Sequence, residues 1–270
     1  MAITSPSELI AAARSRPQIK KTTAFATVGN TPFSAFDVAG TPGAGSLTIG
    51  NTTSGVVPTK ATAGFPGFPD FGSGAVGYLA EARFKSSALG GCELYDRLWH
   101  AGSFSLATLQ TFTLTGQPSY LGRLPGGTDY TGLEIFLEIN TAVAASAVTV
   151  AVGYTNEVGT TGRSTGASPA LTSFTTRRLV RMPLQAGDKG PRTIDSVTIG
   201  GTVAATGTVN VLVGRLLSDH DIRVINAMDR QPFDGTSGPI VFQDSAFWPV
   251  IEPDSTSSGV FKMGMTIING

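Results

Sequence analysis

The sequence predicts an all-β protein: an antiparallel β-sandwich or jelly roll, with an extended Gly/Pro-rich N-terminal arm and one short N-terminal helix. Three observations predict this fold class. Several segments alternate apolar and polar residues with a period of two, which places the apolar side chains on one face of a strand. Glycine is abundant, at 34 of 270 residues, as expected for a chain with many turns. Between the strands no helical pattern recurs, so a parallel βαβ fold is not indicated.

The first sixteen residues predict a short helix. Ser5 can cap it, Pro6 suits its first turn, and Glu8 stands where a capping-box carboxylate belongs. Pro17 disfavours helical geometry in the residue before it, so the helix should end near Arg16. A helix of about a dozen residues is too short to be stable alone and must dock on something. The cations of this region are either solvated or contact an acidic partner surface: Arg14, Arg16, Lys20 and Lys21.

Residues 22–75 differ in composition from the rest of the chain. They contain ten Gly, five Pro and six Phe, but only three charged residues. Gly and Pro at this density oppose long helices and central strands. An exposed Phe, however, forgoes roughly 1.5–3 kcal/mol of burial. We therefore expect an arm over residues 1–77 that anchors on its own domain or on a neighbouring subunit, and a β-sandwich domain over residues 78–270. The expected anchors are Phe25, Phe33, Phe36, Phe65, Phe68 and Phe71.

The β pattern begins near Tyr78. It is clearest in "LEIFLEI" (133–139), where four aliphatic side chains occupy alternate positions. Two further segments with strong alternation are "AVTVAVGY" (147–154) and "TVNVLVG" (208–214). Weaker strand patterns occur in "TLQTFTL" (108–114), "RTIDSVTI" (192–199) and "VFKMGMTII" (260–268). Short strands separated by long turns are typical of a sandwich or a jelly roll.

Composition and charge argue against several functions. Nineteen Lys and Arg balance nineteen Asp and Glu, so no basic field favours direct binding to nucleic acid. No run of 18 apolar residues occurs, and the N-terminus lacks the pattern of a secretory signal, so we expect no membrane span and synthesis in a cytoplasm. Cys92 is the only cysteine, and we expect it to be a buried, inert thiol.

Four motifs suggest chemistry, and each fails a test of context or spacing. "GSGAVG" (72–77) follows "PGFPDF", which cannot be the buried strand that a dinucleotide site requires. Glu134 and Glu138 on one strand stand roughly 13 Å apart, too far for a glycosidase pair, and we interpret them as solvated. His220 lies between two aspartates, but sequence neighbours in an extended segment point to opposite faces. "TTRRLVRMP" (175–183) reads as an edge strand with exposed arginines.

We therefore predict no catalytic residue and no cofactor, and interpret the chain as a protein without enzymatic activity. A calcium site in "GGTDYTG" (126–132) stays open, although the EF-hand spacing is absent. The loop "YTNEVGTTGRSTG" (154–166) suits turns that need positive φ, and Arg163 is expected to fix it through Glu157 or backbone carbonyls.

Three segments resemble virion structural proteins of tailed bacteriophages and prophages. They are "LYDRLWHAGSFSL" (94–106), "VGYTNEVGTTGRST" (152–165) and "RMPLQAGDKGPRTIDSVTI" (181–199), and "GTVNVLVGRLL" (207–217) follows in the same order. The resemblance covers about half of the chain, residues 94–217. It implies a β-rich subunit associated with a capsid or tail, with no enzymatic site to carry over.

The leading hypothesis is a capsid decoration (cement) protein. It would be made in the cytoplasm of a bacterial host, bind the major capsid protein and its own copies, as a homotrimer or another homo-oligomer, and reside in the virion. Two alternatives stay open. One is a module that binds host glycan near Trp99, Tyr130 and Trp248, and the other is a tail or connector subunit.

Overall fold

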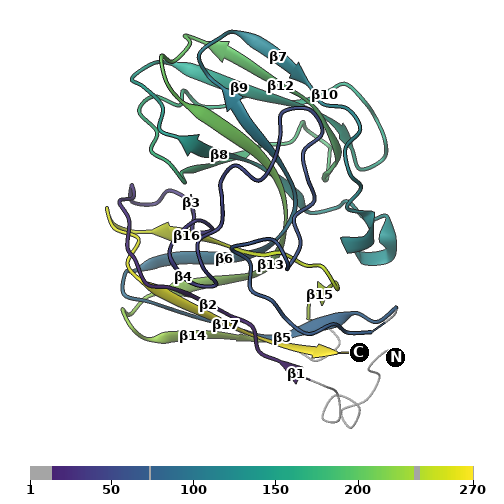
Figure 1. Ribbon diagram of the computed structural model, residues 1–270, viewed down its shortest axis with the longest axis vertical. Coiled ribbons are helices and arrows are strands. Elements are labelled where there is room, and N and C mark those ends of the chain that lie inside the picture. The colour runs from purple at the N-terminus through teal and green to yellow at the C-terminus, as the bar shows by residue number, and fades with distance from the viewer. Residues whose placement is uncertain (1–13, 73, 234–237, 270) are drawn as a thin grey trace. The chain divides into compact units, whose positions relative to one another are not determined.

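The computed structural model describes residues 14–72, 74–233 and 238–269 (Figure 1). The chain forms two compact units. Unit 1 comprises Met1–Ser46, Thr59–Asp96 and Leu216–Gly270, and unit 2 comprises Leu47–Pro58 and Arg97–Arg215. The division therefore falls inside two long strands, β6 (Gly90–Ser105) and β13 (Thr208–Ile222).

Unit 1 contains an antiparallel sheet of seven described strands. Its main order is β14-β5-β17-β2-β4, while β1 pairs with β17 and β15 pairs with β5. The bounds are β1 (Arg14–Ser15), β2 (Gln18–Lys21), β4 (Gly40–Thr41), β5 (Gly77–Ser86), β14 (Met228–Pro232), β15 (Ile240–Val241) and β17 (Phe261–Asn269). A second layer places β16 (Phe247–Pro253) between β3 (Phe33–Ser34) and the first seven residues of β6.

The apolar faces of both layers meet in one core. Phe84, Met263 and Met265 from the seven-stranded sheet belong to the same buried cluster as Leu94 and Ile251 from the second layer. The alternation of "VFKMGMTII" is confirmed, because β17 buries Phe261, Met263, Met265 and Ile267 while Lys262 is exposed. Unit 1 is therefore a β-sandwich, as the sequence predicts.

Unit 2 is also a sandwich. One sheet has the order β10-β9-β12-β7, and β8 pairs with β11 on one side and with the first part of β13 on the other. The bounds are β7 (Gln110–Thr113), β8 (Leu133–Thr141), β9 (Val148–Asn156), β10 (Arg163–Ala167), β11 (Leu179–Met182) and β12 (Pro191–Gly201). The alternating valines and leucines of these strands share one buried core.

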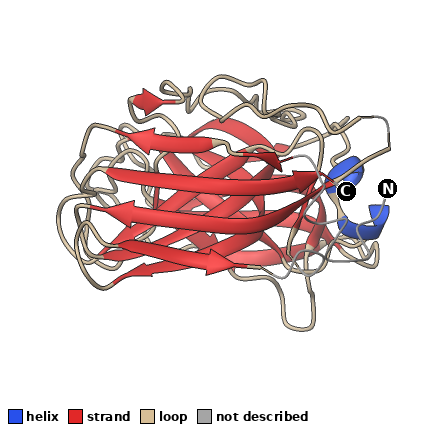
Figure 2. Cartoon of the chain, turned by 90° about the horizontal axis from the view of Figure 1, so that it is seen from below, coloured by secondary structure: helices blue, strands red, loops and turns tan. Residues whose placement is uncertain are grey.

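Helix is almost absent from the part of the chain that the structure describes. It contains two single 3-10 turns, η1 (Leu121–Arg123) and η2 (Pro125–Gly127), and strands with their connecting loops form the rest (Figure 2). No described helix has the length and apolar character needed to cross a membrane. The all-β prediction is thus confirmed, with antiparallel pairing throughout the described sheets.

The N-terminal region differs from the expected helix and arm. The expected helix lies mostly outside the described residues, but Arg14–Ser15 pairs with Ile268 and Ile267 as strand β1, so a helix end near Arg16 is wrong. Residues of the expected arm supply β2, β3 and β4 to unit 1, while Leu47–Pro58 belongs to unit 2. In an extended arm, the backbone N–H and C=O groups would be hydrogen-bonded to solvent. Here these strands hydrogen-bond to strands that are distant in the sequence.

Candidate functional site

A row of three lysines crosses the outer face of the seven-stranded sheet. Lys262 in β17 is paired in register with Lys85 in β5 on one side and with Lys20 in β2 on the other. Neighbouring strands lie about 4.8 Å apart, so the row spans about 10 Å. None of the three lysines makes an ion pair with a described residue. We call Lys20, Lys85 and Lys262 the lysine row.

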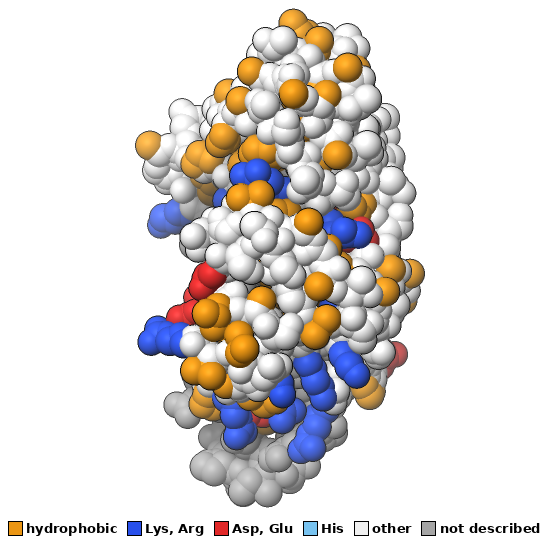
Figure 3. Space-filling view, turned by 90° about the vertical axis from the view of Figure 1, so that its left-hand side faces the viewer, with side chains coloured by type: hydrophobic (Ala, Val, Ile, Leu, Met, Phe, Trp, Pro, Cys, Tyr) orange, Lys and Arg blue, Asp and Glu red, His pale blue; other side chains and the backbone are white. Residues whose placement is uncertain are grey.

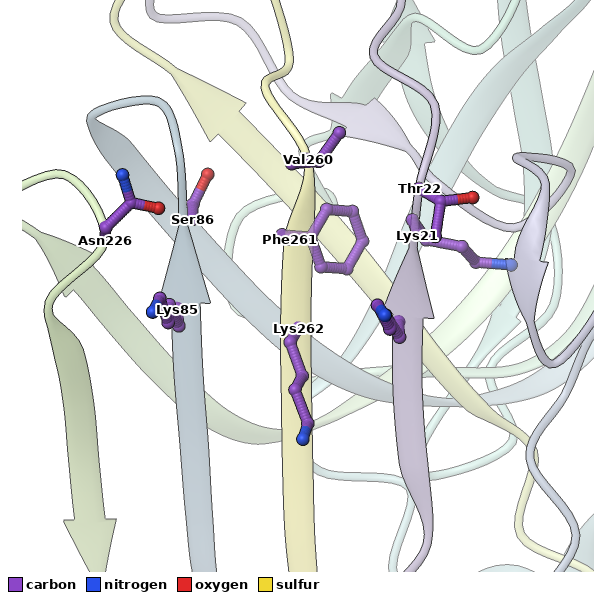
Figure 4. A pocket seen from close by; sticks show the side chains of 9 residues that line it. Lys21, Thr22, Lys85, Ser86, Asn226, Val260, Phe261 and Lys262 are labelled. Atoms are coloured by element: carbon purple, nitrogen blue, oxygen red, sulfur yellow. The ribbon is translucent and has the colours of Figure 1, made fainter.

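The row exists because of strand alternation. The residues that flank it along the strands, such as Ile19, Phe84 and Met263, are buried in the core of unit 1. Successive side chains of a strand point to opposite faces, so the lysines between them point outward. Figure 4 shows Lys85 and Lys262 at one level of neighbouring strands.

The lysine row borders a shallow pocket of about 340 Å³ that Lys20, Lys85 and Lys262 line together with Thr22 and Val260. A second hollow of about 180 Å³ shares Lys262 and adds Arg83 and Gln18. The two hollows form one basic surface on the outer face of this sheet. Figure 3 shows Lys and Arg side chains close together beside hydrophobic ones.

Lys21 also lines the pocket but points inward and is 2 % exposed. Its Nζ donates hydrogen bonds to the carbonyl oxygens of Val38 at 2.8 Å, Pro42 at 3.3 Å and Phe36 at 3.4 Å. Burial lowers the pKa of Lys21 to about 8, against the opposing charge of Asp37. Lys21 therefore holds the 36–42 segment in place. Unlike the three lysines of the row, it is not available to bind a ligand.

The carboxylate of Glu81, in the same strand as Lys85, is already engaged. Glu81 accepts a hydrogen bond of 2.7 Å from Nε of Arg230, and its other oxygen lies 3.6 Å from Nε of Arg83. Like charges directly opposite each other across strands destabilise a sheet, and no described carboxylate compensates the row. The arrangement can attract an anionic group or surface, but it offers no acid–base pair for catalysis.

Exposed aliphatic side chains border the basic surface. Val260 and Met228 are exposed and each lines one of the two hollows, while Val224 and Ile225, 63 % and 53 % exposed, directly precede the pocket residue Asn226 in the sequence. The amide of Asn226 donates to the carbonyl of Ser86 at 2.7 Å, which fixes the 223–227 turn beside the pocket. Exposed apolar side chains that are bordered by polar ones are typical of a surface that contacts another macromolecule.

The predicted contact residues divide into two groups. Lys20 belongs to the lysine row, Arg16 is exposed, Lys21 is buried, and Arg14 lies in β1. Of the two expected alternatives, the structure shows anchoring on the chain's own domain for five aromatic residues, which are buried: Phe33, Phe36, Phe65, Phe68 and Phe71. Phe25 is half-buried and packs edge-on against Phe33, with ring centroids 5.9 Å apart. These rings complete the core of the chain, so they are not an exposed surface for another subunit.

Two other interpretations need correction. The aromatic residues expected near a glycan site are buried, since Trp99 and Trp248 are 0 % exposed and Tyr130 is 7 % exposed. Glu138 is not solvated: it is fully buried, accepts 2.8 Å from Nη2 of Arg97 and 3.0 Å from Nδ2 of Asn210. A buried carboxylate requires such partners because desolvation is costly.

The remaining candidates have structural partners. Nδ1 of His220 lies 2.7 Å from Asp229 in β14, a strand of the other sheet, and not against the aspartates adjacent in sequence. Asp129 accepts a hydrogen bond from the Thr131 amide, and the described residues contain no group of three His, Cys, Asp or Glu placed to hold a metal. The "GSGAVG" motif leads into strand β5. Cys92 is buried, and desolvation raises the pKa of its thiol.

Sequence reasoning missed Lys85 and Lys262. Each is a lone lysine within an apolar alternation, "ARFKS" and "VFKMG", which indicates that it points outward. Lys85 and Lys262 become neighbours only because β5 and β17, which are far apart in the sequence, pair in this register. A local sequence pattern cannot predict the register of such a pair.

No protein-family model matches the chain, and no curated protein matches it. Among solved structures, it is similar to the T13 viral particle of infectious bursal disease virus, with 11 % identity, a TM-score of 0.21, and coverage of 96 % of this chain and 77 % of that chain. The VP2 subviral particle of the same virus gives 12 % identity and a TM-score of 0.20, covering 95 % and 80 %. A likeness at this TM-score carries no argument about function.

Proposed function

We propose that the chain is a structural subunit of a virion, a capsid decoration (cement) protein that acts by adhesion and not by turnover. The observation that carries this proposal is the lysine row. Three uncompensated cations at strand spacing cost the isolated sheet stability. Natural proteins retain destabilising residues where function requires them. Contact with an acidic surface would remove the repulsion between the three lysines.

The sequence supports the same reading. Residues 94–217 resemble virion structural proteins of tailed phages, and those residues form most of unit 2. The proposed partners are the major capsid protein and further copies of the chain. The basic surface of unit 1, and not the buried phenylalanines, is the proposed contact.

The experiment is gradient purification of particles from the virus whose genome encodes the chain. We expect the wild-type chain to co-purify with the particles in a fixed ratio. Lys85→Glu with Lys262→Glu should reduce its occupancy more than tenfold, since reversal of the charge repels an acidic partner.

The matched control reverses two exposed cations of unit 2, Lys189→Glu with Arg192→Glu, and should leave occupancy unchanged. Circular dichroism melting shows that each variant is folded. Absence of the wild-type chain from purified particles would reject the proposed function. Equal occupancy of the two double variants would reject the role of the lysine row.

A further inference from the structure

Unit 1 carries a second charged surface, of opposite sign to the lysine row. It lies on the outer face of the other layer of the sandwich, in which the part of β13 from Leu216 onward is next to β6. Its residues are Glu93 in β6, Asp219 and Asp221 in β13, and Glu252 in β16. Alternation again sets the direction, because Cys92, Leu94, Ile222 and Ile251 belong to the core. We call these four residues the acidic face.

The four carboxylates are close together. Glu252 pairs in register with Gly91, two residues from Glu93, so the two glutamates are diagonal neighbours on one face. Glu93 and Asp219 both lie near enough to Cys92 for their charges to add to the effect of burial on its pKa. Asp221 is held by Arg223 at 2.8 Å, whereas neither Asp219 nor Glu252 makes an ion pair with a described residue.

The chain as a whole has no net charge, yet the lysine row and the acidic face lie on opposite faces of the unit 1 sandwich. We propose that the acidic face of one copy binds the lysine row of a second copy. This inference rests on the proposed docking role of the lysine row and names its partner. The three lysines would face Asp219 and Glu252, which make no ion pair with a described residue, together with Glu93 and the Arg223-bound Asp221.

A second copy fits better than a polyanion or an anionic membrane. A nucleic acid or an anionic membrane would attract the lysine row but would repel the acidic face, which would have no partner. Contact between two different faces is heterologous, so each added copy presents a new lysine row or acidic face and assembly continues into a ring or an array. That geometry is suited to a repeating shell.

Sedimentation velocity of the full chain tests the contact. We expect wild-type chains to self-associate at an ionic strength of about 0.1 M and to dissociate near 1 M, where the Debye length falls to about 3 Å. Two double variants each reverse one face: Lys85→Glu with Lys262→Glu, and Asp219→Lys with Glu252→Lys. Each double variant alone should self-associate more than tenfold more weakly than the wild-type chain, because its two faces then carry charges of the same sign.

The decisive step is an equimolar mixture of the two double variants, in which each contact between one variant and the other again joins opposite charges. The mixture should regain association, while the folded control Lys189→Glu with Arg192→Glu should behave as wild type. A monomeric wild-type chain, or a mixture that stays monomeric, would overturn the inference. If the mixture stays monomeric but the chain still co-purifies with particles, the proposed function stands and the acidic partner is another protein.

Discussion

Arg163 holds Asp188 with two parallel hydrogen bonds, from Nε and Nη2 to the two carboxylate oxygens, each 2.8 Å long. The hydroxyl of Tyr154 and the amide of Asn156 donate to the same carboxylate. Arg163 therefore fixes the loop through Asp188, and not through Glu157 or backbone carbonyls as expected, while Glu157 accepts a hydrogen bond from the backbone amide of Lys189. The 154–166 loop is fastened to the loop after β11, which explains its polar composition without a ligand.

The first prediction concerns acid stability. The hydrogen bonds from Arg163, opposed by desolvation, hold the pKa of Asp188 well below its usual range. Because the folded pKa is depressed, Asp188 contributes stability above the unfolded pKa of about 4, and this contribution is lost as the pH falls below it. Asp188→Asn should therefore be less stable than wild type at pH 7, and the difference should shrink towards pH 2 in urea unfolding. A constant difference across that range would contradict the assignment.

The second prediction is that the lysine row costs stability. Lys262→Gln removes the central charge between Lys85 and Lys20 and should raise the free energy of unfolding by about 0.2–1 kcal/mol. The gain should disappear at about 1 M salt, because screening removes the repulsion. Lys189→Gln, at an exposed position in unit 2, is the control and should change little. Destabilisation by Lys262→Gln would show that the row is not repulsive.

The third prediction concerns the buried Lys21. A titration of its side chain by NMR should give a pKa of about 8 in the folded protein. The unfolded chain keeps this proton up to a pH of about 10.4, so the stability of wild type should rise between these two values. Lys21→Met should lack that rise. A folded pKa near 10 would show that the three carbonyl oxygens outweigh the desolvation.

The fourth prediction tests the role of the phenylalanines. Phe68 stacks on Phe71 and packs against Phe247, with ring centroids 5.4 Å apart in both pairs. Phe68→Ala should lower the free energy of unfolding by about 3 kcal/mol, as for other large buried residues. Val158→Ala, at a position 75 % exposed, should be neutral. A folded and fully stable Phe68→Ala chain would restore the idea of a free aromatic arm.

The fifth prediction concerns the buried ion pair of unit 2. Glu138→Ala leaves the Arg97 guanidinium, 0 % exposed, without its carboxylate and should cost about 3–5 kcal/mol. The double variant Arg97→Met with Glu138→Leu removes both charges and should recover most of that loss. If the double variant is as unstable as Glu138→Ala, packing and not charge accounts for the cost.

The strands were the most predictable part of the molecule. A period of two in "LEIFLEI" or "VFKMGMTII" indicates a strand with one buried face. The bounds of β8 and β17 agree closely with these two segments. The division into units was not predictable, because β6 and β13 each run from one unit into the other without a break in pattern.

The candidate site was predictable only in part. Lys20 was identified through its cluster with Lys21, yet alternation separates these two neighbours onto opposite faces. The phenylalanines of residues 25–71 were expected to be buried somewhere, which their apolar area dictates, but composition cannot tell an internal contact from an external one. Glu138 was misread for a related reason, since its partner Arg97 is 41 positions away in the chain.

Strand β17 lies between β5 and β2 in the seven-stranded sheet, and it follows every other described strand of that sheet in the sequence. Unit 2, in contrast, consists of residues that all precede Leu216. On the ribosome, unit 2 can therefore mature while the earlier strands of unit 1 still wait for their central neighbour. Lys262 would then join Lys20 and Lys85 only after β17 has been translated, so the lysine row is completed later than the strands on either side of it.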